Sequence, residues 1–215
     1  MNSLLKSIIS IFKKDKKLNT FESSAKYWEN RYLSKGNSGS GSYGRLAGFK
    51  SKIINDFVLD NNIKEVIEFG CGDGNQLKLS NYPSYIGFDV SNKSIDICRE
   101  KFSNDKGKIF LNIKDFRNQK ADLVLSLDVI YHLVEDDVFK NYMFDLFKAS
   151  TKYVIIYSSN HDEYKTEHVK HRIFTDWINE NIKDFKIKDI IPNDYPYQEG
   201  VPETSYADFY IYEKF

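Results

Sequence analysis

The sequence predicts an α/β fold in which seven strands form a mostly parallel sheet, with helices on both faces and a final antiparallel pair. Short apolar runs alternate with helical patterns from residue 64 onward, as in a parallel sheet. A glycine-rich turn follows the first apolar run, and two strand patterns without a helix between them close the chain. With 215 residues, the chain is long enough for one domain with its own core.

Five short apolar runs predict the parallel strands, because strands buried on both faces show nearly continuous apolar sequence. These predicted strands are 66–69, 85–88, 109–113, 123–127 and 153–157. Apolar residues at helical spacing predict four helices among and before the strands. They cover 44–60, 73–80, 92–102 and 135–149. Ser91 is placed to cap the helix over 92–102.

The C-terminal third has a different pattern. Thr175 or Asp176 is placed to cap a short helix over 177–181. Residues 185–191 and 206–215 alternate as strands on either side of a proline-containing loop. Because no helix separates these two strands, we expect them to pair antiparallel. They complete the seven strands.

The chain divides into an N-terminal segment (1–20), a lid and helix (21–62) and a core (63–215). Residues 1–20 combine an apolar helical face with a lysine-rich end. They predict either a helix packed on the domain or a partner, or weak contact of residues 4–17 with anionic lipid. No apolar run reaches the roughly 18–20 residues of a membrane span. We expect a cytoplasmic protein, and the alternative is a protein that contacts the inner membrane peripherally.

Composition excludes several function classes. Lys and Arg number 31 and Asp and Glu number 31, so the chain lacks the basic excess of a general nucleic-acid binder. Two cysteines, Cys71 and Cys98, suit a reducing compartment and argue against a disulfide framework. With these and only four histidines, whose spacing matches no familiar ligand set, we expect no metal site.

The strongest motif is VIEFGCGDGNQL, residues 66–77, where a strand runs directly into a glycine-rich turn. Glycines permit the sharp turn and the close approach of a ligand. Asp89 follows the second strand and can accept hydrogen bonds from both hydroxyls of a ribose. Glu68 and Asp73 beside the turn would repel a pyrophosphate, and the GxGxxG pattern of NAD-dependent enzymes is missing. S-adenosylmethionine (SAM), an adenosine with a sulfonium and an ammonium, fits these acids.

Four motifs in this region resemble the class I SAM-dependent methyltransferase family. EFGCGDGNQL is similar to its first motif and GFDVS to its second, whereas DF (115–116) and LSLDVIYHL (125–133) resemble its adenine-binding and fourth-strand motifs. The resemblance implies a Rossmann-like fold, with SAM as cofactor and S-adenosylhomocysteine (SAH) as product. It places the methionine part of SAM on Glu68, Gly70, Cys71 and Gly72, the ribose on Asp89 and Val90, the adenine on Asp115 and Phe116, and the far wall on Leu127 and Asp128.

Upstream, YWENRY (27–32) and SGSGSYGR (38–45) resemble the N-terminal lid of many small bacterial methyltransferases. This implies that Tyr27, Tyr32, Ser42 and Arg45 contact SAM, the last two at its carboxylate, and that Tyr43 faces the substrate. Trp28 and Tyr32 are equally suited to be core aromatics. On physical grounds alone, residues 34–44 are either a flexible linker or a ligand-binding loop.

Residues for chemistry follow the fourth strand. His132 lies at the carboxyl edge that faces the transferred methyl group, which makes it the candidate base, with Tyr131 beside it. A histidine on a surface turn is the alternative. His168, His171 and Arg172 precede the C-terminal helix and predict either an anion site for a phosphorylated or nucleotide-linked acceptor or a hydrated loop.

A finer resemblance, to methyltransferases of bacterial surface-polysaccharide clusters, rests on SGSGSYGRLAGFK and DVIYHLVED together with the first motif. Those clusters include the ones that decorate capsules with O-methyl phosphoramidate. The sequence therefore predicts a SAM-dependent O-methyltransferase for a small anionic or sugar-containing acceptor, in capsule or surface-polysaccharide biosynthesis. The alternative is a noncatalytic SAM-binding partner subunit, and the oligomeric state stays open.

Overall fold

The computed structural model describes residues 21–215. A seven-stranded sheet has the order β3-β2-β1-β4-β5-β9-β8. The strands are β1 (Glu65–Phe69), β2 (Ser84–Asp89), β3 (Lys108–Asn112), β4 (Ala121–Leu127), β5 (Ser150–Ser158), β8 (Phe185–Ile191) and β9 (Asp208–Lys214). The first five pair in parallel, and β9 is antiparallel to both of its neighbours. The predicted sheet and its closing antiparallel pair are confirmed.

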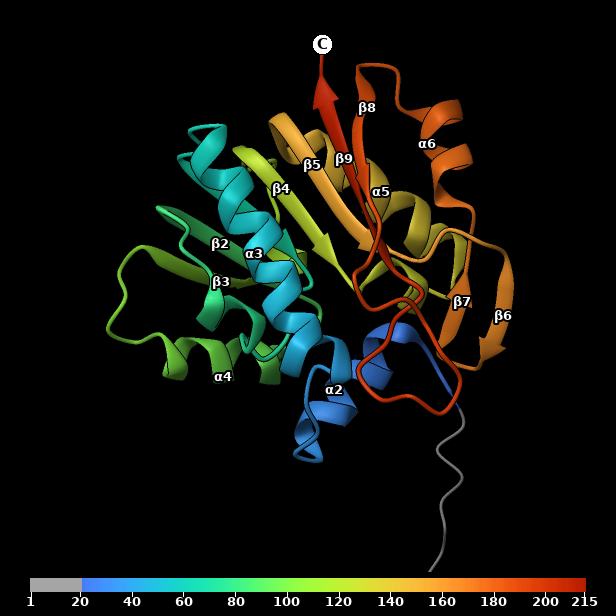
Figure 1. Ribbon diagram of the computed structural model, residues 1–215. Helices are drawn as coiled ribbons and strands as arrows, with labels where there is room; N and C mark the ends of the chain where they lie inside the picture. The colour runs from blue at the N-terminus through green and yellow to red at the C-terminus, as the bar shows by residue number, and fades with distance from the viewer. Residues whose placement is uncertain (1–20) are drawn as a thin grey trace, which may run out of the picture.

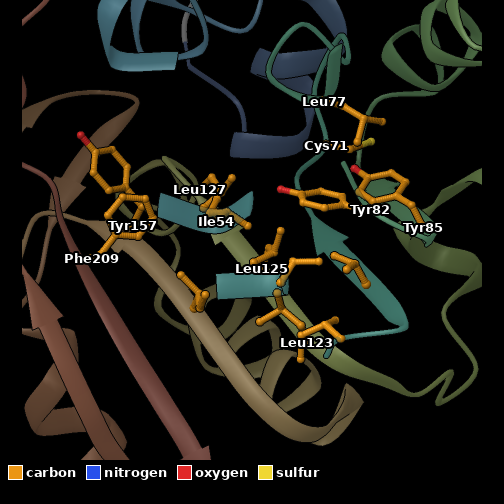
Figure 2. Packing of buried hydrophobic residues seen from close by; sticks show 14 of the residues in the cluster. Ile54, Cys71, Leu77, Tyr82, Tyr85, Leu123, Leu125, Leu127, Tyr157 and Phe209 are labelled. Carbon is orange, nitrogen blue, oxygen red and sulfur yellow. The ribbon is translucent and has the colours of Figure 1, made fainter. Parts of the chain in front are cut away.

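Helices cover both faces of the sheet (Figure 1). Helices α3 (Gly44–Asp60) and α4 (Asn92–Lys101) pack on one face, and α5 (Asp136–Ala149) and α6 (Phe174–Asn181) pack on the other. The side chains of β4 alternate between two hydrophobic clusters, as the pleat of a strand requires. Leu125 packs with Ile54 of α3 in the first cluster, which Figure 2 shows, whereas Val124 packs with Met143 of α5 in the second.

The helices over 44–60, 92–102 and 135–149 form close to their predicted bounds. Leu46, Ile54 and Val58 lie on the buried stripe of α3, which explains its place on the sheet. The Ser91 hydroxyl accepts a hydrogen bond from the Ser94 amide at 3.1 Å, so the predicted cap of α4 is confirmed.

The predicted helix over 73–80 is wrong. Only a 3-10 turn, η2 (Gln76–Leu79), forms there. Gly74 has a φ of +70°, and the Asp73 carboxylate accepts from the Asn75 amide at 3.0 Å, so the first residues of the segment form a local turn instead of helix. The remainder is too short to repay helix nucleation.

The cap predicted for the C-terminal helix is also wrong. Helix α6 begins at Phe174, so Thr175 and Asp176 lie inside its first turn. The Thr175 hydroxyl bonds instead to Asn160, which belongs to the loop after β5. A contact with another loop therefore decides where this helix begins.

A separate two-stranded hairpin, β6 (Glu163–Thr166) and β7 (Val169–His171), was not predicted. Its strands pair antiparallel, with Glu163 opposite His171. Their residues are mostly charged or polar, so they lack the apolar signal by which the sheet strands were found.

Helix α2 (Ser24–Leu33) lies beyond the carboxyl ends of the parallel strands (Figure 1). It is fixed there by Ser24, whose amide and hydroxyl donate to the Glu135 carboxylate at 2.8 and 2.5 Å. The segment 1–20 lies outside the described residues, so both interpretations of it remain predictions. Among residues 21–215, no helix has both the length and the apolar character needed to cross a bilayer.

Candidate active site

A cavity of about 380 Å³ opens where β1, β2 and β4 end and α2 covers the sheet edge. Its volume is in the range of pockets for small organic ligands. Eleven residues predicted from the sequence lie on its wall: Tyr32, Ser42, Glu68, Gly70, Cys71, Gly72, Asp89, Val90, Leu127, Asp128 and His132. Residues scattered over more than a hundred positions of sequence therefore meet at one site.

The turn after β1 is tied to the end of β2 by Asp89. Its carboxylate accepts from the Gly72 amide and from the Ser91 amide, each at 2.9 Å. Gly72 has a φ of +57°, and a Cβ there would lie 2.3 Å from the Ser38 hydroxyl. Burial raises the pKa of Asp89. The turn thus needs glycine both for its backbone conformation and for the close approach of the neighbouring loop.

Glu68 is the second buried acid on the wall. The Tyr85 hydroxyl donates to its Oε2 at 2.6 Å, and burial raises the pKa of Glu68 to about 7. A cationic ligand in the cavity would favour the charged form of this carboxylate.

The loop 34–44 packs on the glycine-rich turn and does not act as a free linker. Asp73 is the anchor, because its amide donates to the Ser38 hydroxyl at 2.9 Å and its carboxylate accepts from the Tyr43 hydroxyl at 2.8 Å. Asp73 and Tyr43 therefore hold the loop from outside the described cavity wall, whereas Ser38 and Ser42 lie on that wall.

Two predicted adenine contacts lie away from the cavity. Asp115 is exposed at the end of the 3-10 turn η3 (Ile113–Asp115), and Ile113 takes the place on the wall. Phe116 packs edge-on against Phe69 and Phe88, in the core beneath the wall. Strand β3 ends at Asn112, one residue earlier than predicted, and the 3-10 turn η3 follows immediately.

Arg45 and Tyr27, predicted to contact SAM, also lie outside the cavity wall. The Arg45 guanidinium donates to the carbonyls of Glu203 and Pro202 at 2.9 and 3.1 Å. The Tyr27 ring stacks on the ring of His168 with centroids 4.4 Å apart. Arg45 thus holds the C-terminal loop and is not free to meet a methionine carboxylate.

An ion pair on the wall, formed by Lys50 and Asp128, was not predicted from the sequence. The Lys50 ammonium donates to Asp128 Oδ2 at 2.5 Å, and the Lys50 side chain is only 1% exposed. Asp128 has a φ of +60°, a strained conformation for a residue other than glycine. One signal pointed to this pair: Lys50 lies four residues after Leu46, on the apolar stripe of the predicted helix.

Replacing Lys50 with methionine is expected to lower the free energy of unfolding by about 3–5 kcal/mol, because the largely buried carboxylate of Asp128 would lose its cationic partner. Denaturant unfolding measures the loss. Lys52→Met is the matched control on the same helix, since Lys52 pairs with Asp56 on the surface, and it should change stability by less than about 1 kcal/mol. Equal losses in the two variants would contradict this account.

His132 is the histidine of the cavity wall. Its Nδ1 lies 3.1 Å from the carbonyl oxygen of His168, so Nδ1 carries the proton and Nε2 is left as the acceptor. The ring also meets the edge of Trp28, with centroids 4.9 Å apart. Burial lowers the pKa of His132 to about 4, which keeps the imidazole neutral at physiological pH.

Tyr131, predicted beside the base, is not on the described wall. Its hydroxyl donates to Asp128 Oδ1 at 2.9 Å, and burial raises its pKa well above the usual range. Tyr131 therefore positions Asp128 and is not suited to proton exchange with an acceptor.

The predicted anion site is not assembled. Arg172 donates to the carbonyls of Leu133 and Val134 at 2.8 and 3.0 Å and pairs with Asp136 at 2.7 Å. His171 is buried away from the cavity, and His168 contributes its carbonyl to His132. Arg172 thus fastens β7 to the segment that carries the histidine of the wall.

We expect Arg172→Ala to lower the free energy of unfolding by about 1.5–3 kcal/mol, since its hydrogen bonds are charge-assisted. For a chain of this size, that corresponds to a fall in Tm of several degrees. Lys170→Ala is the control, because Lys170 pairs with the same Asp136 but lacks the two strong contacts with backbone carbonyls, and it should cost less. If Arg172→Ala raised the KM for an acceptor without changing Tm, that result would instead support the anion site predicted from the sequence.

The sheet is parallel except for β9, its last strand in the chain, which runs in the opposite direction. The cavity opens at the carboxyl edge of this sheet, beside the glycine-rich turn. This combination is the architecture of SAM-dependent methyltransferases. Residues 44–177 match the sequence profile of the family described as a methyltransferase domain, and the chain belongs to this family. No curated protein matches the chain by sequence.

Solved structures share the fold at low sequence identity. The N-methyltransferase NodS from Bradyrhizobium japonicum WM9, in complex with SAH, superposes with a TM-score of 0.65 at 11% identity, over 90% of this chain and 99% of that chain. Magnesium protoporphyrin IX methyltransferase from Synechocystis PCC 6803 with bound SAH gives 0.60 at 15% identity, over 98% and 100%. The protein is a SAM-dependent methyltransferase, and SAM is its cofactor.

Proposed function

We propose that this methyltransferase transfers the methyl group to a hydroxyl of a small, sugar-containing acceptor, as an O-methyltransferase of capsule or surface-polysaccharide biosynthesis. One observation carries the reaction type: His132 stands on the cavity wall as a neutral imidazole with Nδ1 tied to the His168 carbonyl. A hydroxyl must lose its proton as it attacks, so it needs such a base. The polysaccharide setting rests on the sequence resemblance.

The wall fits SAM by the chemistry of its donors and acceptors. Asp89, buried and fixed by two amides, is placed to accept from the ribose hydroxyls. Glu68 and Asp128 on the wall suit the ammonium group of the methionine part. When bound, SAM supplies an electrophilic methyl group on its sulfonium.

The remaining steps belong to side chains of this protein. Trp28 and Tyr32 of α2 cover the cavity and exclude water, which strengthens electrostatic interactions inside it. Nε2 of His132 takes the proton of the acceptor hydroxyl. The His168 carbonyl then stabilises the imidazolium through the Nδ1 hydrogen bond. Alignment of the acceptor supplies much of the rate in such a displacement.

The charges on the cavity wall indicate which charge the acceptor carries. Its described residues include five carboxylates, Glu68, Asp89, Asp128, Glu135 and Asp145, against the single ammonium of Lys50, which is already paired. A further anion would be repelled in such a cavity. We therefore favour the neutral sugar hydroxyl over the anionic acceptor that the sequence analysis left open.

An amine is the second candidate, because the same acidic wall would attract a protonated amino group. The test incubates the purified protein with SAM and a panel of nucleotide sugars, amino sugars and short capsular oligosaccharides. Mass spectrometry then detects SAH and the methylated product. A methyl ether supports the proposal, whereas methylation confined to an amino group would replace it. SAM binding without SAH formation across the panel would favour the noncatalytic partner subunit.

A further inference from the structure

A second cluster of ligating side chains lies outside the cavity wall, at the open end of the β6–β7 hairpin. His161 belongs to the loop after β5, Glu163 begins β6, and His171 ends β7 directly opposite Glu163. One potential metal-ligand atom from each of the three lies within 4.8 Å of the other two. None of these residues serves the proposed methyl transfer.

His171 holds an unpaired nitrogen in this cluster. The residue is only 6% exposed, and its Nδ1 lies 2.5 Å from the Ser159 hydroxyl. Its Nε2 is buried and has no hydrogen-bond partner among residues 21–215. A buried polar atom without a partner destabilises the fold, so a ligand bound to this nitrogen would remove that cost. The Ser159 hydroxyl can accept a hydrogen bond from Nδ1, and in that tautomer Nε2 carries the lone pair that a metal requires.

His161 and Glu163 already have the spacing of metal ligands. The His161 ring stacks on the His171 ring with centroids 4.6 Å apart, and its Nε2 lies 3.5 Å from Glu163 Oε2. Zinc bonds to nitrogen and oxygen of about 2.0–2.2 Å imply that two tetrahedral ligands are roughly 3.3–3.5 Å apart. The third atom lies within 4.8 Å of both, so the three ligand atoms must draw together by no more than roughly 1.5 Å to reach this spacing.

We propose that His161, Glu163 and His171 bind one Zn²⁺ ion, with water in the remaining position. Two imidazoles and one carboxylate are a donor set that zinc accepts. This proposal departs from the sequence expectation of no metal site, which rested on spacing along the chain. The register of the β6–β7 hairpin, which the sequence did not predict, brings Glu163 and His171 together.

A metal ion at this site would link the two strands of the hairpin to each other. It closes the open end of β6 and β7, while the turn at the other end carries His168, whose carbonyl accepts the hydrogen bond of His132 Nδ1. Zinc would thereby help to position the proposed base. This positioning role rests on the proposed function, whereas metal binding itself does not.

The test titrates Zn²⁺ alone into tag-free, chelator-treated protein by calorimetry. We expect one ion per chain, and a loss of affinity of more than about tenfold in both His161→Ala and Glu163→Gln, since even an outer-sphere partner of a metal ligand is worth that much. The matched controls, His168→Ala and Glu167→Gln, change the same residue types in the same hairpin and should bind zinc as the wild type does.

Hydrogen exchange gives a readout that is independent of activity. Zinc should slow exchange of the amides of residues 163–171 in the wild type but not in Glu163→Gln. The proposal is overturned if zinc does not bind in a 1:1 ratio, or if the two ligand variants bind it as tightly as the controls. Zinc binding that follows this pattern while His132→Ala remains fully active would leave the metal site standing and remove only the positioning role.

Discussion

Replacing His132 with alanine is expected to lower turnover by about 10²–10⁴-fold while the dissociation constant of SAM stays near its wild-type value. The imidazole is fixed by the His168 carbonyl and lies on the wall, but it makes no hydrogen bond to the glycine-rich turn. Its loss therefore removes the base and leaves the cofactor contacts in place. Steady-state kinetics and calorimetry on the same preparation measure the two quantities.

The pH dependence is a second check on His132. Because burial lowers its pKa to about 4, the imidazole is protonated and inactive below that pH and free to accept a proton above it. Turnover limited by this base should rise through about pH 4 and stay level above about pH 6. A titration of the base near the usual histidine value of about 6.5 would contradict the assignment.

Tyr131→Phe is the matched variant for His132→Ala. It removes the hydroxyl that holds Asp128 but changes no residue of the described wall, so we expect a smaller effect on turnover. An unchanged turnover in His132→Ala with the true acceptor would show that no base is needed. The acceptor oxygen would then be ionised before it attacks, as in a phosphoramidate or carboxylate.

Asp89→Ala is expected to weaken SAM binding by about ten- to a few-hundred-fold. Two ribose hydrogen bonds at about 0.5–1.5 kcal/mol each, strengthened by a charged acceptor, account for this range. The same substitution leaves the Gly72 and Ser91 amides without their acceptor, which loosens the turn. Calorimetry with SAM and with SAH measures the loss.

Two controls separate the ribose contact from a general loss of structure. Asp96→Ala removes an exposed acid from α4 and should leave SAM affinity unchanged. Asp89→Asn keeps one acceptor oxygen in the same place and should bind SAM with intermediate affinity. Wild-type affinity in Asp89→Ala, with its fold intact by circular dichroism, would remove Asp89 from the cofactor site.

Several features of the site follow from local sequence patterns. A strand that ends in Gly70-Cys71-Gly72, an acid at the end of the next strand and a histidine after the fourth are each defined by a few consecutive residues. In a parallel sheet, the carboxyl ends of neighbouring strands meet at one edge, so these residues converge without further information. This is why eleven residues of the wall could be predicted.

Two of the differences from the sequence prediction concern long polar side chains. Arg45 bonds to Glu203 and Arg172 to Leu133, partners far away in the sequence. A flexible guanidinium reaches whichever carbonyl the fold brings near, and no periodicity marks that choice. Both arginines were therefore predicted to bind ligands when they fasten loops.

The sequence by itself determined the seven strands of the main sheet, the sharp turn after the first strand and the sheet edge at which the cavity opens. Apolar periodicity and turn residues encode these features over short stretches of chain. The tertiary structure decided which polar groups are free. Lys50 is buried against Asp128, Asp73 anchors a loop, and His171 is left with an unpaired nitrogen. Such partners lie far apart along the chain, and only the packed fold determines their distances.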